Sequence, residues 1–312
     1  MVRLAALAAL AAGVAGCGFG SGGESEGQAT LTVTRDYGSE VLVQATEEDP
    51  PESETVIRFL DRKADITTRY GGGFVQSIEG VSGELRDGRN FDWFFYVNGI
   101  ESSIGSAEVE VRGGDRIWWD HRDWTDAMRV PAVVGSWPEP FLQASAAGDP
   151  TPVGLACEAA PGECEEARDL LAGEGIAVGE ENADAAGSEP APRMLVGPWG
   201  SLRDDPAAAQ LDEGPATSGV FARFEPNPHG GHELVALDER AKVALRLGTD
   251  AGLVAAVRNN DDPPTWIVTG GDERGVDAAL GLLASRDLSN RYAVVAVPDG
   301  APVSLPALDG GG

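Results

Sequence analysis

Short segments between residues 30 and 124 alternate apolar and polar side chains with the period of two that is typical of β-strands. One segment differs, because Val56, Phe59 and Leu60 recur at the spacing of a helix that buries one face. The predicted strands are 30–35, 41–45, 66–69, 74–78, 93–97 and 116–124. A hairpin, one helix and then further strands are typical of a small α+β domain with one helix packed on its sheet.

From residue 153 to residue 300 the pattern changes, and short apolar runs are followed by loops and then by helical periodicity. Repeated strand–loop–helix order predicts an α/β sandwich with a largely parallel sheet. Two further segments, 218–224 and 234–237, are predicted to form an antiparallel pair. The apolar runs are 153–156, 194–196, 266–269 and 292–297, and the helices are near 164–171, 206–211 and 275–284.

Length and composition agree with this division of the chain. The 312 residues and the hydrophobic content of 42% are enough for two modest cores. We therefore expect a first domain at 30–130 and a second at 153–300. The proline-rich segment 131–152 is predicted to link them, and 301–312 is predicted to be a flexible tail.

The first seventeen residues have the features of an export signal. Arg3 supplies a positive charge, an apolar segment runs from Leu4 to Val14, and the sequence V-A-G-C ends at Cys17. This V-A-G-C sequence looks like a bacterial lipobox, in which the cysteine is lipidated and becomes the mature N-terminus. A plain secretory signal is the alternative. Residues 18–29 are then a flexible tether, and the sequence predicts an extracytoplasmic lipoprotein anchored to the cell membrane.

Charge and cysteine content narrow the chemistry further. The formal net charge of −28 opposes binding to nucleic acid or to an anionic membrane surface. In an oxidising compartment Cys157 and Cys164 are predicted to form a disulfide that closes a small loop. Metal binding is the weaker alternative, because no second pair of cysteines or histidines lies nearby in the sequence.

Aromatic side chains are concentrated in residues 91–124. This stretch holds four of the seven tryptophans, although only 6% of the chain is aromatic. Alternation places Trp93 and Phe95 on one face of a strand and Phe94 and Tyr96 on the other. These rings either build the core of the domain or form a surface on which a flat ligand stacks.

The aromatic pattern continues after Asn98-Gly99, which is a strong hairpin signal. On the next strand Trp118 lies on one face and Trp119 on the other. We expect Tyr96 and Trp118 to be the exposed members of the two strands. The residues predicted to bind a ligand are Trp93, Tyr96, Asn98, Trp118, Trp119 and Trp124.

Three sequence blocks in the first domain resemble a known family. They are W-F-F-Y-V-N-G-I-E-S-S-I-G from Trp93, G-D-R-I-W-W-D-H-R-D-W from Gly114, and Y-G-G-G-F-V-Q-S-I-E-G from Tyr70. Together they resemble the transcobalamin-like C-terminal domain of bacterial surface proteins, over about residues 30–125. The resemblance implies a β-grasp-like fold and, as in vitamin B12 carriers, a domain that closes over one face of the corrin. Those carriers add a large helical barrel, which no segment of this sequence is predicted to form.

Two polar motifs have residue types that occur in catalytic or ligand-binding sites. In Asp120-His121-Arg122-Asp123 the neighbouring arginine disfavours a cation, and Asp120 and Arg122 are expected to form a surface pair. Gly270–Gly275 follows a predicted strand, as a phosphate-binding loop does. Asp272 in this loop is better explained as a helix N-cap, since its carboxylate would repel phosphate.

Histidine content gives little support to metal binding or catalysis. His229 and His232 share one Pro/Gly loop, where a weak metal site is the alternative to a structural turn. With three histidines and no nucleophile beside a base, the sequence predicts no catalytic residues, no metal and no cofactor.

These observations predict a non-enzymatic, membrane-anchored lipoprotein whose first domain binds a cobalamin-like or other small ligand. The alternative function is a cell-surface module that interacts with an envelope protein or a glycan and has no small-molecule ligand. An enzyme in the second domain would instead need a polar cluster at the carboxyl ends of its strands.

Overall fold

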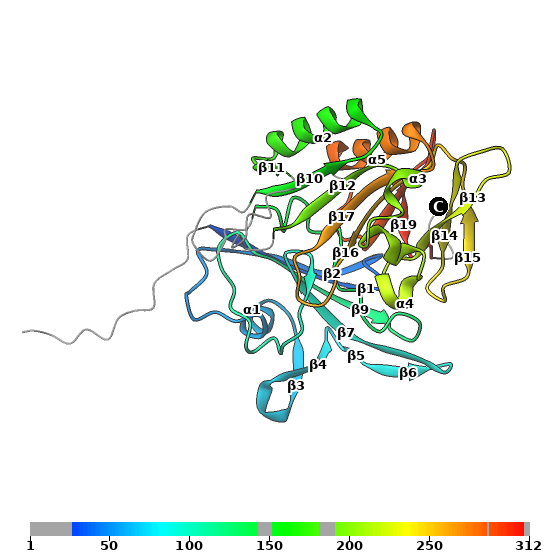
Figure 1. The fold of residues 1–312 in the computed structure, drawn as a ribbon. Helices are drawn as coiled ribbons and strands as arrows, with labels where there is room; N and C mark the ends of the chain where they lie inside the picture. Colours follow the sequence, from blue (N-terminus) through cyan, green and yellow to red (C-terminus); the bar gives the residue numbers. More distant parts are fainter. Residues whose placement is uncertain (1–26, 143–151, 181–190, 286, 309–312) are drawn as a thin grey trace, which may run out of the picture.

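The computed structural model describes residues 27–142, 152–180, 191–285 and 287–308. The predicted signal segment, Cys17 and most of the predicted tether lie outside the described residues. The described chain forms two sheet domains that lie directly against each other (Figure 1). No helix among the described residues is long and apolar enough to cross a membrane.

The first domain is built on a sheet with the strand order β2-β1-β9-β7-β6, and β8 extends the pairing of β7. The central strands β1 and β9 are parallel, whereas β1–β2 and β7–β9 are antiparallel. This order, with the first and last strands parallel at the centre, is that of a β-grasp-like sheet. The strands are β1 (Gln28–Arg35), β2 (Glu40–Glu48), β6 (Glu84–Arg86), β7 (Arg89–Val97), β8 (Ile100–Glu101) and β9 (Arg116–Asp123).

One helix, α1 (Val56–Lys63), covers one face of this sheet. It forms because Val56, Phe59 and Leu60 fall on one face and are buried, while Arg62 and Lys63 lie in the last turn, where the helix dipole favours positive charge. A second, small sheet follows, made of β3 (Ile66–Arg69), β4 (Phe74–Ile78) and β5 (Val81–Ser82). The short 3-10 helix η1 (Tyr70–Gly72) connects β3 to β4.

The second domain contains a seven-stranded sheet with the order β11-β10-β12-β17-β16-β18-β19. The four neighbouring strands β11, β10, β12 and β17 pair in parallel. The pairings β17–β16, β16–β18 and β18–β19 are antiparallel. The strands are β10 (Val153–Cys157), β11 (Val178–Glu180), β12 (Arg193–Pro198), β16 (Gly252–Val257), β17 (Thr265–Gly270), β18 (Ala293–Ala296) and β19 (Val303–Leu305). The sheet is therefore mixed, where the sequence predicted a largely parallel one.

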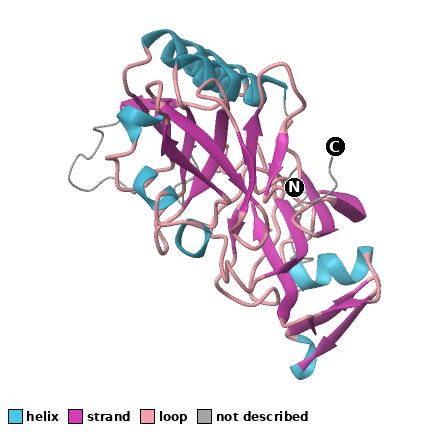
Figure 2. Cartoon of the chain, turned by 90° about the vertical axis from the view of Figure 1, so that its right-hand side faces the viewer, coloured by secondary structure: helices cyan, strands magenta, loops and turns pink. Residues whose placement is uncertain are grey.

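Helices cover one face of the large sheet, and a small sheet faces the other. The helices α2 (Pro161–Gly173) and α5 (Glu273–Ser285) lie side by side over the sheet (Figure 2). Opposite them stand β13 (Ala222–Pro226), β14 (His232–Leu237), β15 (Val243–Arg246), α3 (Trp199–Leu202), η2 (Ala208–Leu211) and α4 (Pro215–Ser218). This arrangement, together with the N-terminal sheet domain, confirms the predicted α+β class.

The described residues of the predicted linker (131–152) and of the predicted flexible tail (301–312) pack into the second domain, and residues 143–151 and 309–312 lie outside the described residues. The chain between β9 and β10 buries Val133, Val134 and Phe141. The predicted flexible tail contains β19, in which Leu305 is buried and the strand pairs with β18. Both segments carry apolar side chains among their prolines and glycines, and these side chains are buried with the core.

Candidate functional site

One face of the β7–β9 ladder forms the core of the first domain. Trp93 and Trp119 are buried on this face, beneath α1 and the small sheet. Phe95 and Trp119 are cross-strand partners with ring centroids 4.8 Å apart, and the indole Nε1 of Trp93 donates a hydrogen bond to Val81 O over 3.0 Å. These contacts stabilise the sheet and leave neither tryptophan open to a ligand in this structure.

The opposite face of the same ladder is covered by the second domain. Tyr96 and Trp118 are buried, and Tyr292 packs edge-on against both, with ring centroids at 5.7 Å and 5.2 Å. Tyr37 joins the cluster through Tyr292 at 5.1 Å and Phe221 at 5.4 Å. The prediction that Tyr96 and Trp118 are exposed is therefore wrong. The strand alternation is as predicted, but a neighbouring domain takes the place of solvent.

A buried carboxylate ties the two domains together within this cluster. Asp120 Oδ1 accepts hydrogen bonds from Thr34 Oγ1 at 2.5 Å and from the Gly38 backbone N–H at 3.1 Å. Asp120 Oδ2 accepts from the hydroxyl of Tyr292 at 2.9 Å. Burial raises the pKa of Asp120, and these hydrogen bonds partly oppose the shift. Both oxygens of the Asp120 carboxylate accept hydrogen bonds from residues of this chain, and these bonds indicate a structural role for the carboxylate.

Arg122 is fully buried and is not part of a surface pair with Asp120, so that expectation is wrong. Its Nη1 and Nη2 donate to the carbonyl oxygens of Ala127 and Met128 at 2.8 Å and 3.1 Å. The guanidinium carbon lies 3.9 Å from the ring centre of Phe94. Arg122 thus fixes the turn that leads out of β9, through hydrogen bonds and a cation–π contact.

Asn98 and Trp124 complete the set of residues predicted to bind a ligand. Asn98 has a positive φ of 55° in the β7–β8 turn, and its side-chain amide donates to Asp115 Oδ1 at 2.7 Å. Its Oδ1 accepts from the Arg116 backbone N–H at 2.8 Å. Both ends of the amide therefore bind the start of β9 and tie the β7–β8 turn to it. Trp124 is half-buried and is the most accessible of the six residues.

The structure also contains a cleft that the sequence did not predict. This interdomain cleft has a volume of about 530 Å³ and lies between the β7–β8 hairpin of the first domain and the β16–β17 loop of the second. Its lining is Val97, Asn98, Ile100, Glu101, Ser102, Ser103, Ile104, Val109, Pro140, Pro192, Arg258, Asp261, Pro263 and Pro264. Most of these side chains are apolar, and several are half-buried with one side facing the cleft.

Two charged groups in the interdomain cleft have different environments. Glu101 is buried, and its two oxygens accept from Arg129 Nε at 3.0 Å and from the Val130 backbone N–H at 2.7 Å. Arg258 donates from Nε to the carbonyl oxygen of Asp262 at 2.6 Å. The Glu101 carboxylate is thus bound by its own domain. Among the described residues, the Nη groups of Arg258 make one long ion pair, from Nη2 to Asp261 Oδ1 at 4.0 Å.

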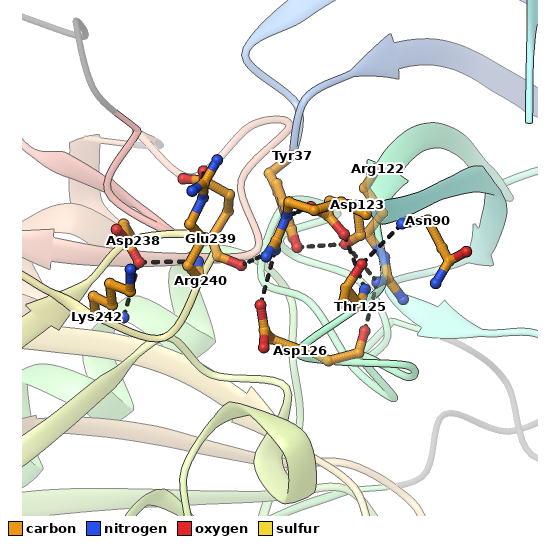
Figure 3. Close-up of polar contacts among 12 residues, drawn as sticks. Tyr37, Asn90, Arg122, Asp123, Thr125, Asp126, Asp238, Glu239, Arg240 and Lys242 are labelled. Atoms are coloured by element: carbon orange, nitrogen blue, oxygen red, sulfur yellow. Dashed lines mark hydrogen bonds and ion pairs between the residues drawn. The ribbon is translucent and has the colours of Figure 1, made fainter. Parts of the chain in front are cut away.

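A second, polar cleft of about 370 Å³ lies where the β6–β7 hairpin meets the β14–β15 turn. The Tyr37 hydroxyl donates to Asp123 O at 2.6 Å, and the side chain of Arg89 pairs with the Asp123 carboxylate. Arg89 also pairs with Asp126 at 2.8 Å and donates to Glu239 O at 3.0 Å. Figure 3 shows Glu239 and its turn facing Tyr37, Asp123 and Asp126. The Arg89 side chain therefore joins Asp123 and Asp126 of the first domain to Glu239 of the second.

The remaining polar motifs have structural partners. His121 Nε2 lies 3.1 Å from Ser82 O, and burial lowers the pKa of this histidine. Asp272 Oδ1 accepts from the Gly275 backbone N–H at 3.2 Å at the start of α5, which confirms its prediction as an N-cap. A Cβ atom at Gly271 would lie 1.9 Å from His232 O, so this loop packs closely against β14.

The two cysteines of the second domain form the predicted disulfide, which joins Cys157 at the end of β10 to Cys164 in α2. His229 and His232 do not meet further ligands: among the described residues no three His, Cys, Asp or Glu side chains are grouped as a metal site would require.

A comparison with protein-family models gives a match within the first domain. Residues 53–122 match the model of a family described as a domain of unknown function, DUF4430. A crystal structure from Ruminococcus gnavus, described as a "putative metal binding protein", aligns with 31% of this chain and 98% of its own, at 16% identity and a TM-score of 0.25. No curated protein sequence matches this chain. Residues 53–122, which include β7 and most of β9, are therefore similar to a domain family of unknown function.

Proposed function

We propose that this chain is an extracytoplasmic lipoprotein, anchored through Cys17, that binds a small apolar ligand without catalysing a reaction. The V-A-G-C sequence and the polar tether that follows support the anchor. The interdomain cleft supports the binding role, because small-molecule sites are concave, mostly apolar and often lie at domain interfaces.

The single observation that carries this proposal is the size and lining of the interdomain cleft. Its volume of about 530 Å³ lies within the range of roughly 300–1,000 Å³ that is usual for small-ligand sites. Val97 and Ile100 of the first domain face Pro263 and Pro264 of the second across it. Burial of an apolar ligand between these walls would contribute about 25 cal/mol for each Å² removed from water.

The polar groups of the cleft favour binding over catalysis. The amide of Asn98 and the carboxylate of Glu101 are both engaged by hydrogen bonds within the first domain. Both groups already hold the β7–β8 hairpin to its own domain, and this structural use favours a binding role over a catalytic one.

A neutral, environment-sensitive dye such as Nile red tests the cleft directly. We expect saturable fluorescence enhancement with the chain from residue 18 onward, which lacks the lipidated Cys17, keeps every described residue and is called the mature chain below. Ile100→Trp fills the cleft and should abolish the enhancement. Leu85→Trp is the matched control, since Leu85 is exposed on β6 and does not line the cleft. Equal enhancement in both variants would overturn the proposal.

A cobalamin-like ligand is the specific version that the resemblance of the first domain implies. Titration with cobalamin, followed by tryptophan fluorescence, tests it because seven tryptophans report on a bound corrin. Saturable quenching at micromolar cobalamin is the expected result. Its absence would remove the corrin version and leave the binding of smaller apolar molecules in place.

A second candidate function, interaction with an envelope protein or a glycan, is favoured by the tip of the β3–β4 hairpin. Tyr70 is 86% exposed and Phe74 46% exposed, with ring centroids 6.3 Å apart. Exposed aromatic pairs are typical of interaction surfaces. Pulldown of envelope material by the wild-type chain, lost in Tyr70→Ala, would support this candidate. Pulldown that Tyr70→Ala leaves unchanged would contradict it.

A further inference from the structure

We infer that the interdomain cleft selects a ligand with an apolar body and one carboxylate, and that Arg258 binds the carboxylate at the mouth of the cleft. This inference rests on the proposed function of the cleft. It adds the chemical class of the ligand and a residue that determines specificity.

Arg258 is a largely buried cation with few partners. Its side chain is 14% exposed and lines the interdomain cleft in the β16–β17 loop. Its Nε group donates to Asp262 O at 2.6 Å, which leaves the two Nη groups at the far edge of the guanidinium. Withdrawing a charge from water is costly unless that charge is paired. The position therefore favours an anion that approaches from the cleft.

The carboxylate nearest to Arg258 in this loop does not supply that pairing well. Asp261 Oδ1 lies 4.0 Å from Arg258 Nη2, and the Asp261 side chain is 92% exposed. Exposed ion pairs contribute little, because water screens them and the side chains lose freedom. A ligand carboxylate held against the apolar wall would be better shielded from water and could accept two parallel hydrogen bonds from the guanidinium edge.

The charges of the cleft favour a simple anion over a zwitterion. Glu101 is the buried carboxylate of the opposite wall, but Arg129 and Val130 already occupy its oxygens, and Arg122 Nη2 lies 3.7 Å away. The guanidinium groups of Arg122 and Arg129 beside Glu101 would repel a ligand ammonium group. A dianionic phosphate would meet the net charge of −28 more unfavourably than a monoanion does. A monocarboxylate with an apolar body is the class that remains.

Octanoate and 1-octanol, which share an alkyl chain and differ in charge, test the inference by calorimetric titration of the mature chain. We expect octanoate to bind about tenfold or more tightly than 1-octanol, as a charge-assisted pair would give. Arg258→Gln should weaken octanoate binding about tenfold more than 1-octanol binding and so remove this difference, and Arg258→Lys should restore part of it. Arg203→Gln is the control, because Arg203 is a half-exposed arginine that does not line the cleft.

The possible outcomes separate the inference from the function on which it rests. If the wild type binds both probes with equal affinity, the cleft still binds an apolar ligand and the inference is overturned. Equal loss of both probes in Arg258→Gln would likewise overturn it, since the arginine would then only shape the cleft. If the wild type binds neither probe, the proposed function and the inference both fail.

Discussion

The hydroxyl of Tyr292 donates a hydrogen bond to Asp120 Oδ2 over 2.9 Å, and this contact joins the second domain to the aromatic strands of the first. Tyr292 precedes β18 in the large sheet, whereas Asp120 lies in the middle of β9. The same tyrosine ring covers Tyr96 and Trp118. The Tyr292 side chain thus covers the Tyr96 and Trp118 rings, on which a flat ligand could otherwise stack.

Removal of the Tyr292 hydroxyl should lower the free energy of unfolding. Tyr292→Phe keeps the ring packing but leaves Asp120 Oδ2 without this donor, at a cost of about 1–3 kcal/mol. Urea unfolding of the mature chain measures the change. Tyr70→Phe is the matched control, because this exposed hydroxyl should alter the free energy of unfolding by less than about 0.5 kcal/mol. Equal stability of the two variants would contradict a structural role for the contact.

The buried carboxylate should make stability depend on pH. Burial raises the pKa of Asp120 above its ordinary value of 3.8. Below that value both states are protonated. As the pH rises above that value, Asp120 loses its proton in the unfolded chain but keeps it in the native state. The native state then binds more protons, so the free energy of unfolding falls as the pH rises, until the pH passes the raised native pKa.

Asp120→Asn removes this titration and tests the sign. The free energy of unfolding of the wild type minus that of Asp120→Asn should decrease as pH rises above about 4, in urea unfolding at stepped pH. Burial also raises the pKa of Asp115. Because Asp115 is present in both chains, taking the difference between their free energies of unfolding cancels its contribution. A difference that stays constant, or increases with pH, would be inconsistent with a raised pKa of Asp120 in the native state.

Trp118 should contribute far more to stability than Trp124. Trp118 is buried between the domains and its Nε1 donates to Thr34 Oγ1 at 2.8 Å, whereas Trp124 is half-buried. Trp118→Ala is expected to cost about 3–5 kcal/mol, the range for a large aromatic side chain removed from a core. Trp124→Ala should cost less than half as much in the same urea unfolding measurement. A reversed order would show that the interdomain face is open in solution.

Cys17 should determine where the chain resides. Cys17→Ala should abolish incorporation of radiolabelled palmitate and release the chain from washed membranes, because a single lipid-modified residue supplies the anchor. The chain with Cys157→Ala and Cys164→Ala should stay at the membrane, since these two cysteines pair with each other. Retention of Cys17→Ala at the membrane would contradict the lipoprotein proposal.

Local sequence signals predicted much of the first domain. Asn98-Gly99 marks a real hairpin, in which both residues have positive φ, and the spacing of Val56 and Phe59 marks α1. The second domain was predicted less completely. β16, from Gly252 to Val257, is buried along its whole length and has no alternation to reveal it. A short apolar run of this kind cannot be distinguished from a buried helix by periodicity.

The candidate site depends on contacts that no local pattern encodes. Periodicity places Tyr96 and Trp118 on one face, but it does not say whether solvent or Tyr292 covers that face. The interdomain cleft likewise combines Ile100 of one domain with Arg258 of the other. The turn-forming residues that flank Arg258 predict only a loop. The proposed role of Arg258 in ligand binding depends on the first-domain residues that share the cleft with it, and the sequence does not show these neighbours.

Photolabelling with an aliphatic diazirine tests the binding of a small apolar ligand in the interdomain cleft most directly. After irradiation of the mature chain, peptide mapping by mass spectrometry should find labels on both walls, within residues 97–104 and 258–264. Excess 1-octanol should compete with this labelling, and Ile100→Trp should prevent it. Labelling confined to the exposed Tyr70–Phe74 tip, or spread over the surface without competition, would contradict a ligand site between the domains.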